Sequence, residues 1–337
     1  MQKDARSLPA TAIRTVARQT ALREIDNQRS QFRQLGIMAD WDSQDATYRT
    51  LDHKYEMRQL QVFQQMVEKG LIYRHFRPVY YSPSSMSALA EAELKYVDDH
   101  VSHSVYVTFD VHSSKVPAIK EVLEGGVKLV VWTTTPWTLT ANMGIAVNPD
   151  MAYSALRRKD NGEVLVIGSD LVESFSALFD GALELELISE FSGTELVGTT
   201  YTPIFSTSSS SASPKEIVPS SHVTPDSGTG LVHCAPAHGP EDYALFKSLN
   251  LLPASSSSKS SDSLVCHVDA TGSFSPEVLD VVSGSDGGRE LIGLAVLDEG
   301  SREIVKILKD RGRLMKIQRF KHRYPYDWKT AKPIIIT

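Results

Sequence analysis

The sequence predicts an α/β fold, in which a helical first part is followed by a β-rich module with helices inserted in it. Two segments within the first 70 residues repeat apolar side chains at the spacing of an α-helix. From residue 100 onward, segments with alternating or continuous apolar side chains dominate, as in β-strands. The chain has 337 residues, which is enough for two or three domains with buried cores.

Two helices are expected in the first part of the chain. The first covers residues 11–35, and the second begins near Asp52, a residue type that often caps helices, and ends at Gly70. The apolar residues that lie on one side are Ile13, Val16, Ala17 and Ala21 in the first helix and Leu60, Phe63 and Val67 in the second.

Strands are expected to dominate the middle of the chain. Residues 71–96 indicate a short strand, a Pro/Ser turn and an extended or helical exit. Residues 104–111 alternate between apolar and polar side chains, and residues 127–133 form a nearly continuous apolar strand. A hairpin is predicted around residues 161–162, an Asn-Gly pair, and residues 171–179 follow as a helix. This order predicts a mixed module.

The last part of the chain contains two serine tracts, a helix and an extended end. The tracts at 206–214 and 254–263 bury too little apolar area to offset the entropy of ordering, so loops are expected there. The helix is expected to start with Ser301 as its N-cap and to end at Gly312. Residues 322–337 end on an apolar run without a strand partner, which indicates a piece of something larger.

Charge and composition weigh against several kinds of site. The net charge of −6 gives no overall basic field for nucleic acid, although a local basic patch would suffice. Cys234 and Cys266 lack CxxC spacing, which disfavours a disulfide framework or structural zinc and fits a reducing compartment. No apolar run reaches the ~20 residues needed to cross a bilayer. The Arg-rich first 33 residues contain acidic residues and no cleavage pattern, which favours a solvated helix over a transit peptide.

The stretch VVWTTTPWTLTAN, residues 130–142, places five threonines directly after an apolar strand. Threonine is a good strand residue, so a threonine-rich edge needs no functional explanation. However, three consecutive hydroxyls followed by Pro136 and Trp137 give an apolar strand a polar end. A small pocket with a few convergent polar groups is built in this way.

The stretch GTGLVHCAPAHGPEDYALF, residues 228–246, predicts a short strand, a loop and a helix that starts at Pro240. The loop presents His233, His238, Glu241 and Asp242. Their spacing matches no metal-ligand motif, and a cysteine next to His233 on a strand would point to the opposite face. For His238 and Glu241, the favoured interpretation is a packed histidine and a carboxylate that caps the helix.

Together, the motifs WTTTPWTLTAN and GTGLVHCAPAHGPEDY resemble the editing insertion of the isoleucyl-tRNA synthetase family, a class I synthetase family. The resemblance implies a partial Rossmann-type catalytic domain at 1–96, a β-rich editing (CP1) domain at 97–320 and a return segment at 321–337. The YPYDW form of the return segment resembles the bacterial and organellar type. A mitochondrial or other organellar location is therefore expected, with a cytoplasmic one as the alternative.

The resemblance also assigns roles to residues. Asp242 would hold the α-ammonium group of valine on misacylated Val-tRNA(Ile), and His233 would form a wall that excludes isoleucine. Threonine hydroxyls would bind the terminal ribose or the attacking water. The residues carried over are Asp242, His233, Thr135 and Thr134 as catalytic residues, and Thr133, Thr138 and Asn142 as substrate-binding residues. Trp137 is interpreted as packing, and Cys234 stands where threonine is usual.

The implied activity is post-transfer hydrolysis, without metal, cofactor or covalent intermediate. The chain contains neither a His-Ile-Gly-His signature nor a KMSKS-type loop, which bind ATP in the full-length family enzyme, so it is not expected to form isoleucyl-adenylate alone. Valine-charged tRNA(Ile) is the expected partner, and no membrane is expected. The alternative hypothesis is a truncated tRNA-binding fragment that is catalytically incomplete.

Overall fold

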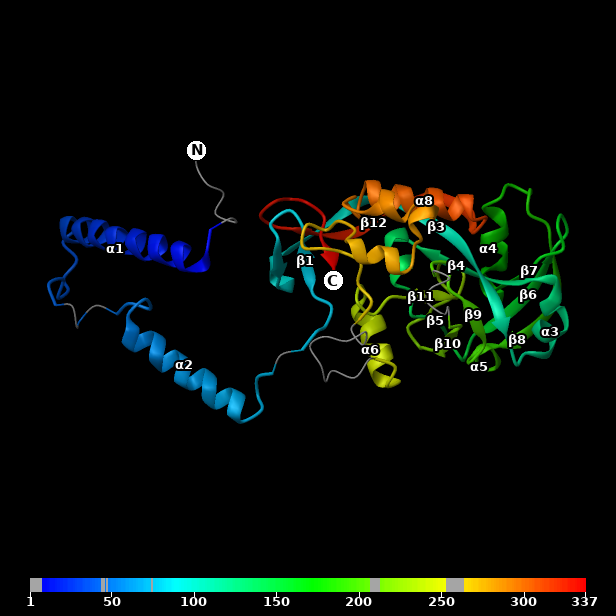
Figure 1. Ribbon diagram of the computed structural model, residues 1–337, viewed down its shortest axis with the longest axis horizontal. Helices are drawn as coiled ribbons and strands as arrows, with labels where there is room; N and C mark the ends of the chain where they lie inside the picture. The colour runs from blue at the N-terminus through cyan, green and yellow to red at the C-terminus, as the bar shows by residue number, and fades with distance from the viewer. Residues whose placement is uncertain (1–7, 44–45, 47, 74, 207–212, 253–263) are drawn as a thin grey trace. The chain divides into compact units, whose positions relative to one another are not determined.

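The structure is a computed structural model that describes the chain except residues 1–7, 44–45, 47, 74, 207–212 and 253–263 (Figure 1). Close contacts between Cα atoms divide the chain into two units, Met1–His75 and Phe76–Thr337. Residues 76–96, which the sequence analysis placed in the first domain, group with the second unit. Apart from residues 206, 213 and 214, the two serine tracts lie outside the described residues.

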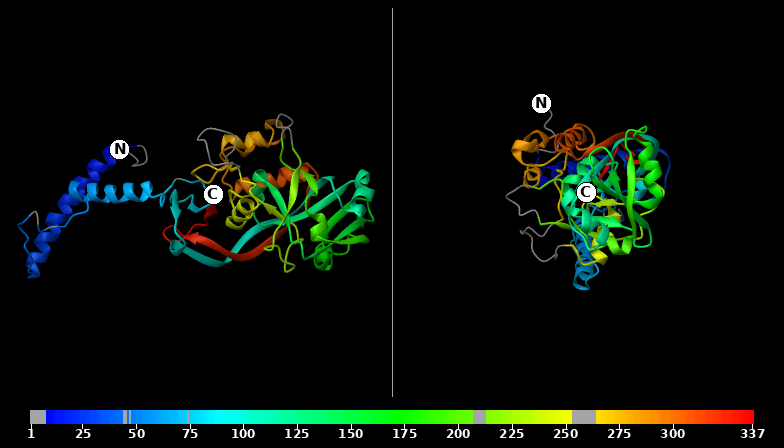
Figure 2. Two further views of the ribbon diagram at one scale, coloured as in Figure 1. Left: turned by 90° about the horizontal axis from the view of Figure 1, so that it is seen from below. Right: turned by 90° about the vertical axis from the view of Figure 1, so that its right-hand side faces the viewer.

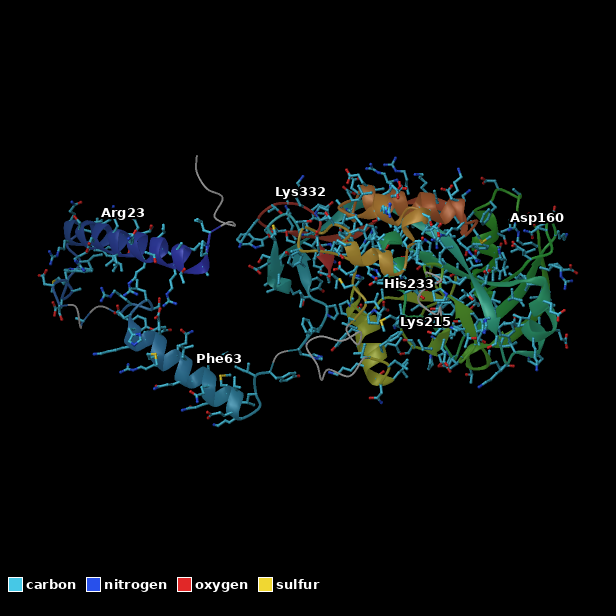
Figure 3. The ribbon with its side chains drawn as sticks, viewed as in Figure 1. Arg23, Phe63, Asp160, Lys215, His233 and Lys332 are labelled. Atoms are coloured by element: carbon cyan, nitrogen blue, oxygen red, sulfur yellow. The ribbon has the colours of Figure 1, made fainter. Side chains whose placement is uncertain are left out.

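The first unit contains both expected helices, α1 (Ala10–Gln34) and α2 (His53–Glu68), which confirms their prediction to within two residues at each end. Asp52 is the N-cap residue of α2, but its carboxylate accepts a hydrogen bond from Arg49 (3.0 Å) rather than capping the helix. The apolar stripe of α2 is exposed, with Phe63 (Figure 3) retaining 52% of its accessible surface. None of the residues of either helix is buried.

The second unit is built around one large sheet. Among the described residues, its strand order is β11-β5-β10-β9-β3-β4-β7-β6-β8, with β12 pairing to β3. Pairs β4–β7 and β5–β10 are parallel and the other pairs are antiparallel. The strands are β3 (Leu94–Ser113), β4 (Val127–Thr133), β5 (Gly144–Val147), β6 (Ala152–Arg158), β7 (Val164–Gly168), β8 (Leu185–Ser192), β9 (Thr200–Thr202), β10 (Lys215–Pro219), β11 (Val232–Cys234) and β12 (Leu314–Asp327).

Helices lie between and beside these strands, which makes the unit a mixed α/β module, as expected. They are α3 (Pro117–Val122), α4 (Val172–Ala177), α5 (Gly193–Leu196), α6 (Pro240–Ser248), α7 (Gly288–Leu291) and α8 (Glu299–Asp310). Short 3-10 helices are η2 (Glu91–Glu93), η3 (Leu123–Gly125), η4 (Pro136–Ala141), η5 (Ser169–Leu171), η6 (Pro276–Asp280) and η7 (Gly284–Asp286). Helix α8 begins before the predicted N-cap Ser301, with Asp298 as its N-cap residue. The Ser301 hydroxyl donates to the Val296 carbonyl (2.6 Å).

The alternation predicted for residues 104–111 is confirmed by how β3 packs. Val105, Val107 and Phe109 lie in the main core of the unit. Tyr106 points to the other face, where it belongs to a second cluster that includes Phe175 of α4. Because both faces of β3 are covered by apolar side chains, this strand forms the centre of the module.

The long strands β3 and β12 run side by side as an antiparallel ribbon, which Figure 2 shows in its left-hand view. The pairing extends from Val107 with Leu314 to Leu94 with Asp327. Asp327 is buried and accepts hydrogen bonds from the hydroxyls of Ser82 (2.7 Å) and Ser85 (2.8 Å). Burial alone would raise the pKa of Asp327, but these bonds and one from the Lys329 N–H outweigh it and lower the pKa to about 2.

A second, small sheet has the order β13-β1-β2, with β1 at Tyr80–Ser82, β2 at Ser87–Leu89 and β13 at Ile335–Ile336. Ile335 pairs with Tyr81, and Ile336 pairs with Tyr80. The prediction that the final apolar run lacks a partner is therefore wrong, because its partner lies about 250 residues earlier in the sequence.

Candidate functional site

The threonine run lies where β4 ends and η4 begins. The Thr133 hydroxyl accepts a hydrogen bond from the Thr135 N–H (3.1 Å), which turns the chain at the end of the strand. Pro136 then starts η4, a position that suits its fixed φ angle and its missing N–H. The Thr138 hydroxyl donates to the Thr135 carbonyl (2.8 Å) and closes the first turn. The hydroxyls are thereby gathered at one end of an apolar strand.

The strand of the second motif, β11, presents its two polarisable side chains to opposite faces. His233 pairs with Ile145 of β5 and faces the threonine run. Cys234 faces the other way, into a cluster with Phe246 and Val218. The expectation that these neighbours cannot form a base–nucleophile pair is confirmed.

Hydrogen bonds link the two motifs through a set of side chains that we call the His233 network: Thr133, Thr135, Thr138, Asn142, Tyr201 and His233. Thr138 Oγ1 lies 3.2 Å from His233 Nε2, and Asn142 Nδ2 lies 2.8 Å from His233 Nδ1. The hydroxyl of Thr135 lies 3.3 Å from those of both Thr133 and Thr138, which is long for an O–H···O bond. The contacts between these hydroxyls are therefore weak, and the Thr135 N–H is the firmer partner of the Thr133 hydroxyl.

Tyr201 completes this network, and it lies outside both sequence motifs. Its hydroxyl donates to Asn142 Oδ1 at 2.7 Å. It lies on β9, a strand of three residues without a recognisable motif. Only the strand pairing of β9 with β3 and β10 brings it to the site, so no local pattern could have indicated it.

Burial sets the protonation state of the histidines. His233 (Figure 3) lies inside the second unit with 7% of its surface exposed, and burial lowers its pKa to about 4. Burial also lowers the pKa of His238 to about 4. His238 packs edge-on against Trp137 (4.6 Å between ring centroids) and donates from Nδ1 to the Ile336 carbonyl (2.9 Å). Both imidazoles are neutral at pH 7, and the interpretation of His238 and Trp137 as packed residues is confirmed.

Asp242 lies in the first turn of α6, on the far side of the loop that follows β11. Its Oδ2 accepts a hydrogen bond from the Ala235 N–H (2.8 Å). Burial raises the pKa of Asp242, and the hydrogen bond from Ala235 offsets this only in part. A hydrogen bond with the Cys234 side chain and an electrostatic interaction with His222 also lower the pKa of Asp242, by smaller amounts. A buried carboxylate of this kind would gain stability from a cation.

Not all of the predicted site residues are brought into direct contact. Five of them, Thr133, Thr135, Thr138, Asn142 and His233, belong to the His233 network. Thr134 is half-buried, and within the described residues its side chain makes no hydrogen bond to that network. Asp242 is connected to the network only through the backbone of the β11 loop. Glu241 lies exposed in the first turn of α6 and does not cap it, so that interpretation is wrong.

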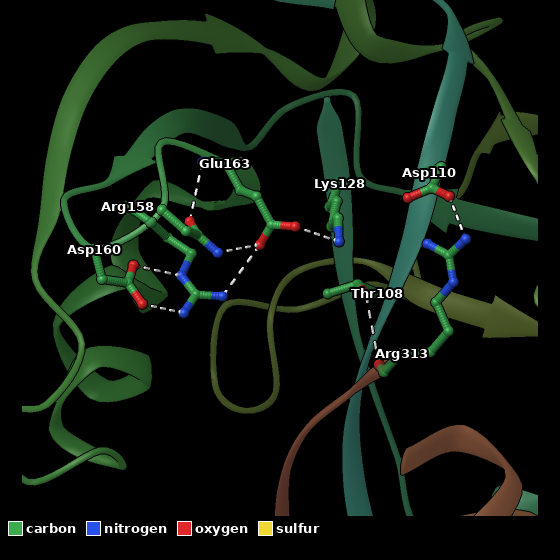
Figure 4. A network of polar contacts seen from close by, with 8 residues as sticks. Thr108, Asp110, Lys128, Arg158, Asp160, Glu163 and Arg313 are labelled. Atoms are coloured by element: carbon green, nitrogen blue, oxygen red, sulfur yellow. Dashed lines mark hydrogen bonds and ion pairs between the residues drawn. The ribbon is translucent and has the colours of Figure 1, made fainter. Parts of the chain in front are cut away.

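A second polar cluster lies away from these motifs, at the ends of β4, β6 and β7 (Figure 4). Glu163 pairs with Lys128 (2.5 Å) and with Arg158 (3.2 Å), and Arg158 also pairs with Asp160 (2.5 Å). The cluster borders a cavity of about 210 Å³. Because each of these cations already has a carboxylate partner, the cluster is a structural tie between strands.

Neither a metal centre nor a membrane segment is found in the part of the chain that the structure describes. No group of three or more His, Cys, Asp or Glu side chains there could hold a metal ion. No described helix is both long and apolar enough to span a membrane.

Comparison with known proteins shows which family the chain belongs to. A family model described as tRNA synthetases class I (I, L, M and V) matches residues 1–309. The mitochondrial isoleucine–tRNA ligases of Macaca fascicularis and Gallus gallus are each 41% identical over 337 residues. The isoleucine–tRNA ligase of a Cyanothece strain is 36% identical over 334 residues. These alignments cover 98–99% of this chain, which spans about a third (31%) of each relative.

Solved structures also align with the chain. The crystal structure of GlLeuRS-CP1 aligns with a TM-score of 0.46 at 15% identity, over 64% of this chain and 98% of that one. The editing domain of Plasmodium falciparum cytosolic leucyl-tRNA synthetase aligns with a TM-score of 0.36 at 14% identity, over 44% and 65% of the two chains. The family match over residues 1–309 and the alignment of 99% of this chain with isoleucine–tRNA ligases establish that the chain belongs to the class I tRNA synthetases.

Proposed function

We propose that the second unit hydrolyses misacylated Val-tRNA(Ile), as the post-transfer editing module of an isoleucine–tRNA ligase. The observation that carries this proposal is the hydroxyl-lined end of β4, which is hydrogen-bonded to a neutral, buried histidine. Family membership and the names of the relatives agree with it. Valine-charged tRNA(Ile) is the proposed substrate, and the mitochondrial relatives support a mitochondrial location.

An isoleucine enzyme needs a second site for a physical reason. Valine lacks one methylene group of isoleucine, which is worth only ~1–3 kcal/mol in an apolar pocket, and isoleucine enzymes are the standard example of this limit. A pocket that is too small for isoleucine can remove the valyl error after transfer. His233 suits one wall of such a pocket, because its ring is held by hydrogen bonds on both nitrogens.

The remaining roles follow from which polar groups are already engaged. The hydroxyls of Thr133 and Thr135, whose contacts with other hydroxyls are weak, are available to the terminal ribose or to the attacking water. Thr134 is proposed to act with them, since it occupies the same turn. The Thr138 hydroxyl is buried and donates to a backbone carbonyl, so it and Asn142 support the wall of the pocket. Asp242 is proposed to bind the α-ammonium of valine.

Hydrolysis of an aminoacyl ester requires a correctly placed water rather than a strong nucleophile. An aminoacyl ester is already activated, so an oriented water and hydrogen bonds to the developing oxyanion are sufficient. His233 is a poor general base, because burial lowers its pKa to about 4 and both of its nitrogens are engaged. We therefore propose direct hydrolysis by water, without a covalent intermediate, metal or cofactor. ATP would serve only the aminoacylation reaction of the full-length family enzyme.

The test compares two substrates on the purified chain. Val-tRNA(Ile) should lose its amino acid faster than it does without protein, whereas Ile-tRNA(Ile) should remain charged. Equal rates on both substrates would refute the proposed specificity. One competing hypothesis is a tRNA-binding fragment without activity. That hypothesis predicts retention of tRNA(Ile) in a filter-binding assay together with no deacylation of either substrate.

A further inference from the structure

Tyr201 is a fully buried side chain whose one polar atom points into the His233 network. Its exposed fraction is 0%, and its ring packs edge-on against Phe109 (5.2 Å between centroids) in the core. Its hydroxyl donates to Asn142 Oδ1 at 2.7 Å. A buried hydroxyl aimed at a second buried polar group fixes the orientation of that group.

Two neighbours determine which way the amide of Asn142 faces. Asn142 Nδ2 lies 3.0 Å from the Gly144 carbonyl oxygen, which can only accept a hydrogen bond. Nδ2 must therefore stay on that side, and Oδ1 must face Tyr201, whose hydroxyl supplies the proton. The second N–H of the same amide is then directed at His233 Nδ1, 2.8 Å away. Rotating the amide by half a turn would set two oxygens against each other at Gly144.

The orientation of Asn142 in turn fixes the tautomer of His233. Because Nδ1 accepts a hydrogen bond from the amide N–H, a neutral imidazole must carry its own proton on Nε2. That N–H donates to Thr138 Oγ1 at 3.2 Å. Thr138 is free to accept, since its own proton is given to the Thr135 carbonyl at 2.8 Å. The hydrogen bonds thus run in one direction, from Tyr201 to the backbone at Thr135.

We propose that Tyr201 is a positioning residue for the editing reaction, which acts through Asn142 to hold His233 in the Nε2–H tautomer with a fixed ring plane. The expected effect on deacylation rests on the proposed function, whereas the expected effect on the His233 tautomer does not. A fixed ring keeps the wall of the valine pocket in place, and the occupied Nδ1 keeps His233 out of proton transfer. Without the tyrosine hydroxyl, Asn142 Oδ1 loses its donor, and only the Gly144 carbonyl still holds the amide in this orientation. The amide is then fixed less firmly, and so is the tautomer of His233.

The experiment compares two tyrosine variants of the full chain. Tyr201→Phe removes only the hydroxyl that faces Asn142. Tyr153→Phe is the matched control: Tyr153 is also 0% exposed, and its hydroxyl bonds the Gly230 carbonyl (2.8 Å) and the Asn148 N–H (2.9 Å), outside the network. Nitrogen-15 NMR of the imidazole reports which nitrogen carries the proton, with the His233 signals assigned from their loss in His233→Gln.

In the unmodified chain, His233 should show a single Nε2–H tautomer. Tyr201→Phe should give a mixture of tautomers and lower the ratio of Val-tRNA(Ile) to Ile-tRNA(Ile) deacylation by about tenfold, the size of one net hydrogen bond. Tyr153→Phe should change neither quantity, although the loss of its two buried hydrogen bonds should lower its unfolding midpoint.

Three results would overturn the inference. The first is an Nδ1–H tautomer in the unmodified chain, a result that does not depend on whether any variant folds. The second is an unchanged His233 spectrum in Tyr201→Phe, and the third is the same spectral change in Tyr153→Phe. If no chain deacylates tRNA while the spectra behave as expected, the proposed function fails and the positioning role of Tyr201 stands.

Discussion

The buried ionisable side chains around β11 differ in their hydrogen-bond partners and in how burial shifts their pKa values. Both nitrogens of His233 already have hydrogen-bond partners, and its neutral form is favoured by burial. Asp242 has the Ala235 N–H and the Cys234 side chain as hydrogen-bond partners, and its pKa is raised by burial. A bound ammonium group would lower the pKa of Asp242. This difference makes Asp242 the residue whose charge is most open to test.

The variant Asp242→Asn should abolish most of the deacylation without unfolding the chain. The asparagine oxygen can still accept from the Ala235 N–H, but the ammonium loses its counter-charge. A hydrogen bond to a charged group is worth ~1.5–3 kcal/mol, so the rate on Val-tRNA(Ile) should fall by roughly 10–100-fold. The exposed neighbour Glu241→Gln is the control and should keep full activity. Retained activity in Asp242→Asn would place the ammonium site elsewhere.

The sequence allowed most of the His233 network to be predicted, because its residues lie in two short motifs. Thr133, Thr135 and Asn142 follow one strand, and His233 lies on another. Tyr201 could not be found in this way, since it lies 59 residues after Asn142 in the sequence. The roles assigned to Thr134 and Asp242 depend on a bound substrate and stay predictions.

At the scale of single elements, prediction was accurate where burial controls the sequence pattern. Strand β4 spans Val127–Thr133, the predicted residues, because most of its side chains are buried. Strand β3 was underestimated: it begins at Leu94, ten residues before the predicted start. Its first half pairs only with β12 and is mostly exposed, so no apolar alternation marks it. Apolar alternation therefore identifies strands that are buried and misses strands that are paired but exposed to solvent.

The helix α5 provides a test of packing at a single element. A Cβ atom added at Gly193 would lie 2.0 Å from the Asn148 carbonyl oxygen and 2.9 Å from the ring of Tyr153. Neither the backbone nor the buried ring can move away cheaply, so Gly193→Ala should lower the free energy of unfolding by ~1–3 kcal/mol or more. Urea unfolding followed by circular dichroism measures this change.

Gly125→Ala is the matched control for that experiment. Gly125 ends η3, and nothing lies within 4 Å of an added Cβ there. Its unfolding free energy should change by less than ~0.5 kcal/mol, as at most surface positions. Equal free energies of unfolding for the two variants would mean that α5 does not pack tightly against Asn148 in solution.

At the scale of the whole molecule, the order of strands could not be predicted. Strand β3 pairs with β12 across long sequence separations, such as the 220 residues between Ser102 and His322 on the two strands. Local patterns define elements but not which distant elements meet, so the partner of β13 was also missed. The division of the chain at residue 75 likewise depends on contacts between distant segments.

The second unit should lose thermal stability as the pH falls from about 6.5 towards 4. Burial lowers the pKa of His233 and His238 to about 4, while unfolded histidines titrate near 6.5. Between these values the unfolded state binds more protons, so a contribution of at most ~3 kcal/mol per histidine is complete above pH 6.5 and is lost below it. Asp242, whose pKa is raised, opposes this trend only in part.

Calorimetry of the chain between about pH 7.5 and about pH 4.5 measures this dependence through the unfolding midpoint. The variant His238→Gln lacks one of the two buried neutral histidines. Its unfolding midpoint should therefore fall less with decreasing pH than that of the unmodified chain. A midpoint that stays constant over this range would show that neither histidine is buried in its neutral form.

The β3–β12 ribbon has a consequence for how such a module can be acquired. Leu94 and Asp327 are strand partners, so the chain enters and leaves the module at neighbouring points, ~5 Å apart. A host protein would need only a surface hairpin to receive more than two hundred residues without rebuilding its own core. The same geometry makes this ribbon a natural junction for transplanting the module into an unrelated scaffold.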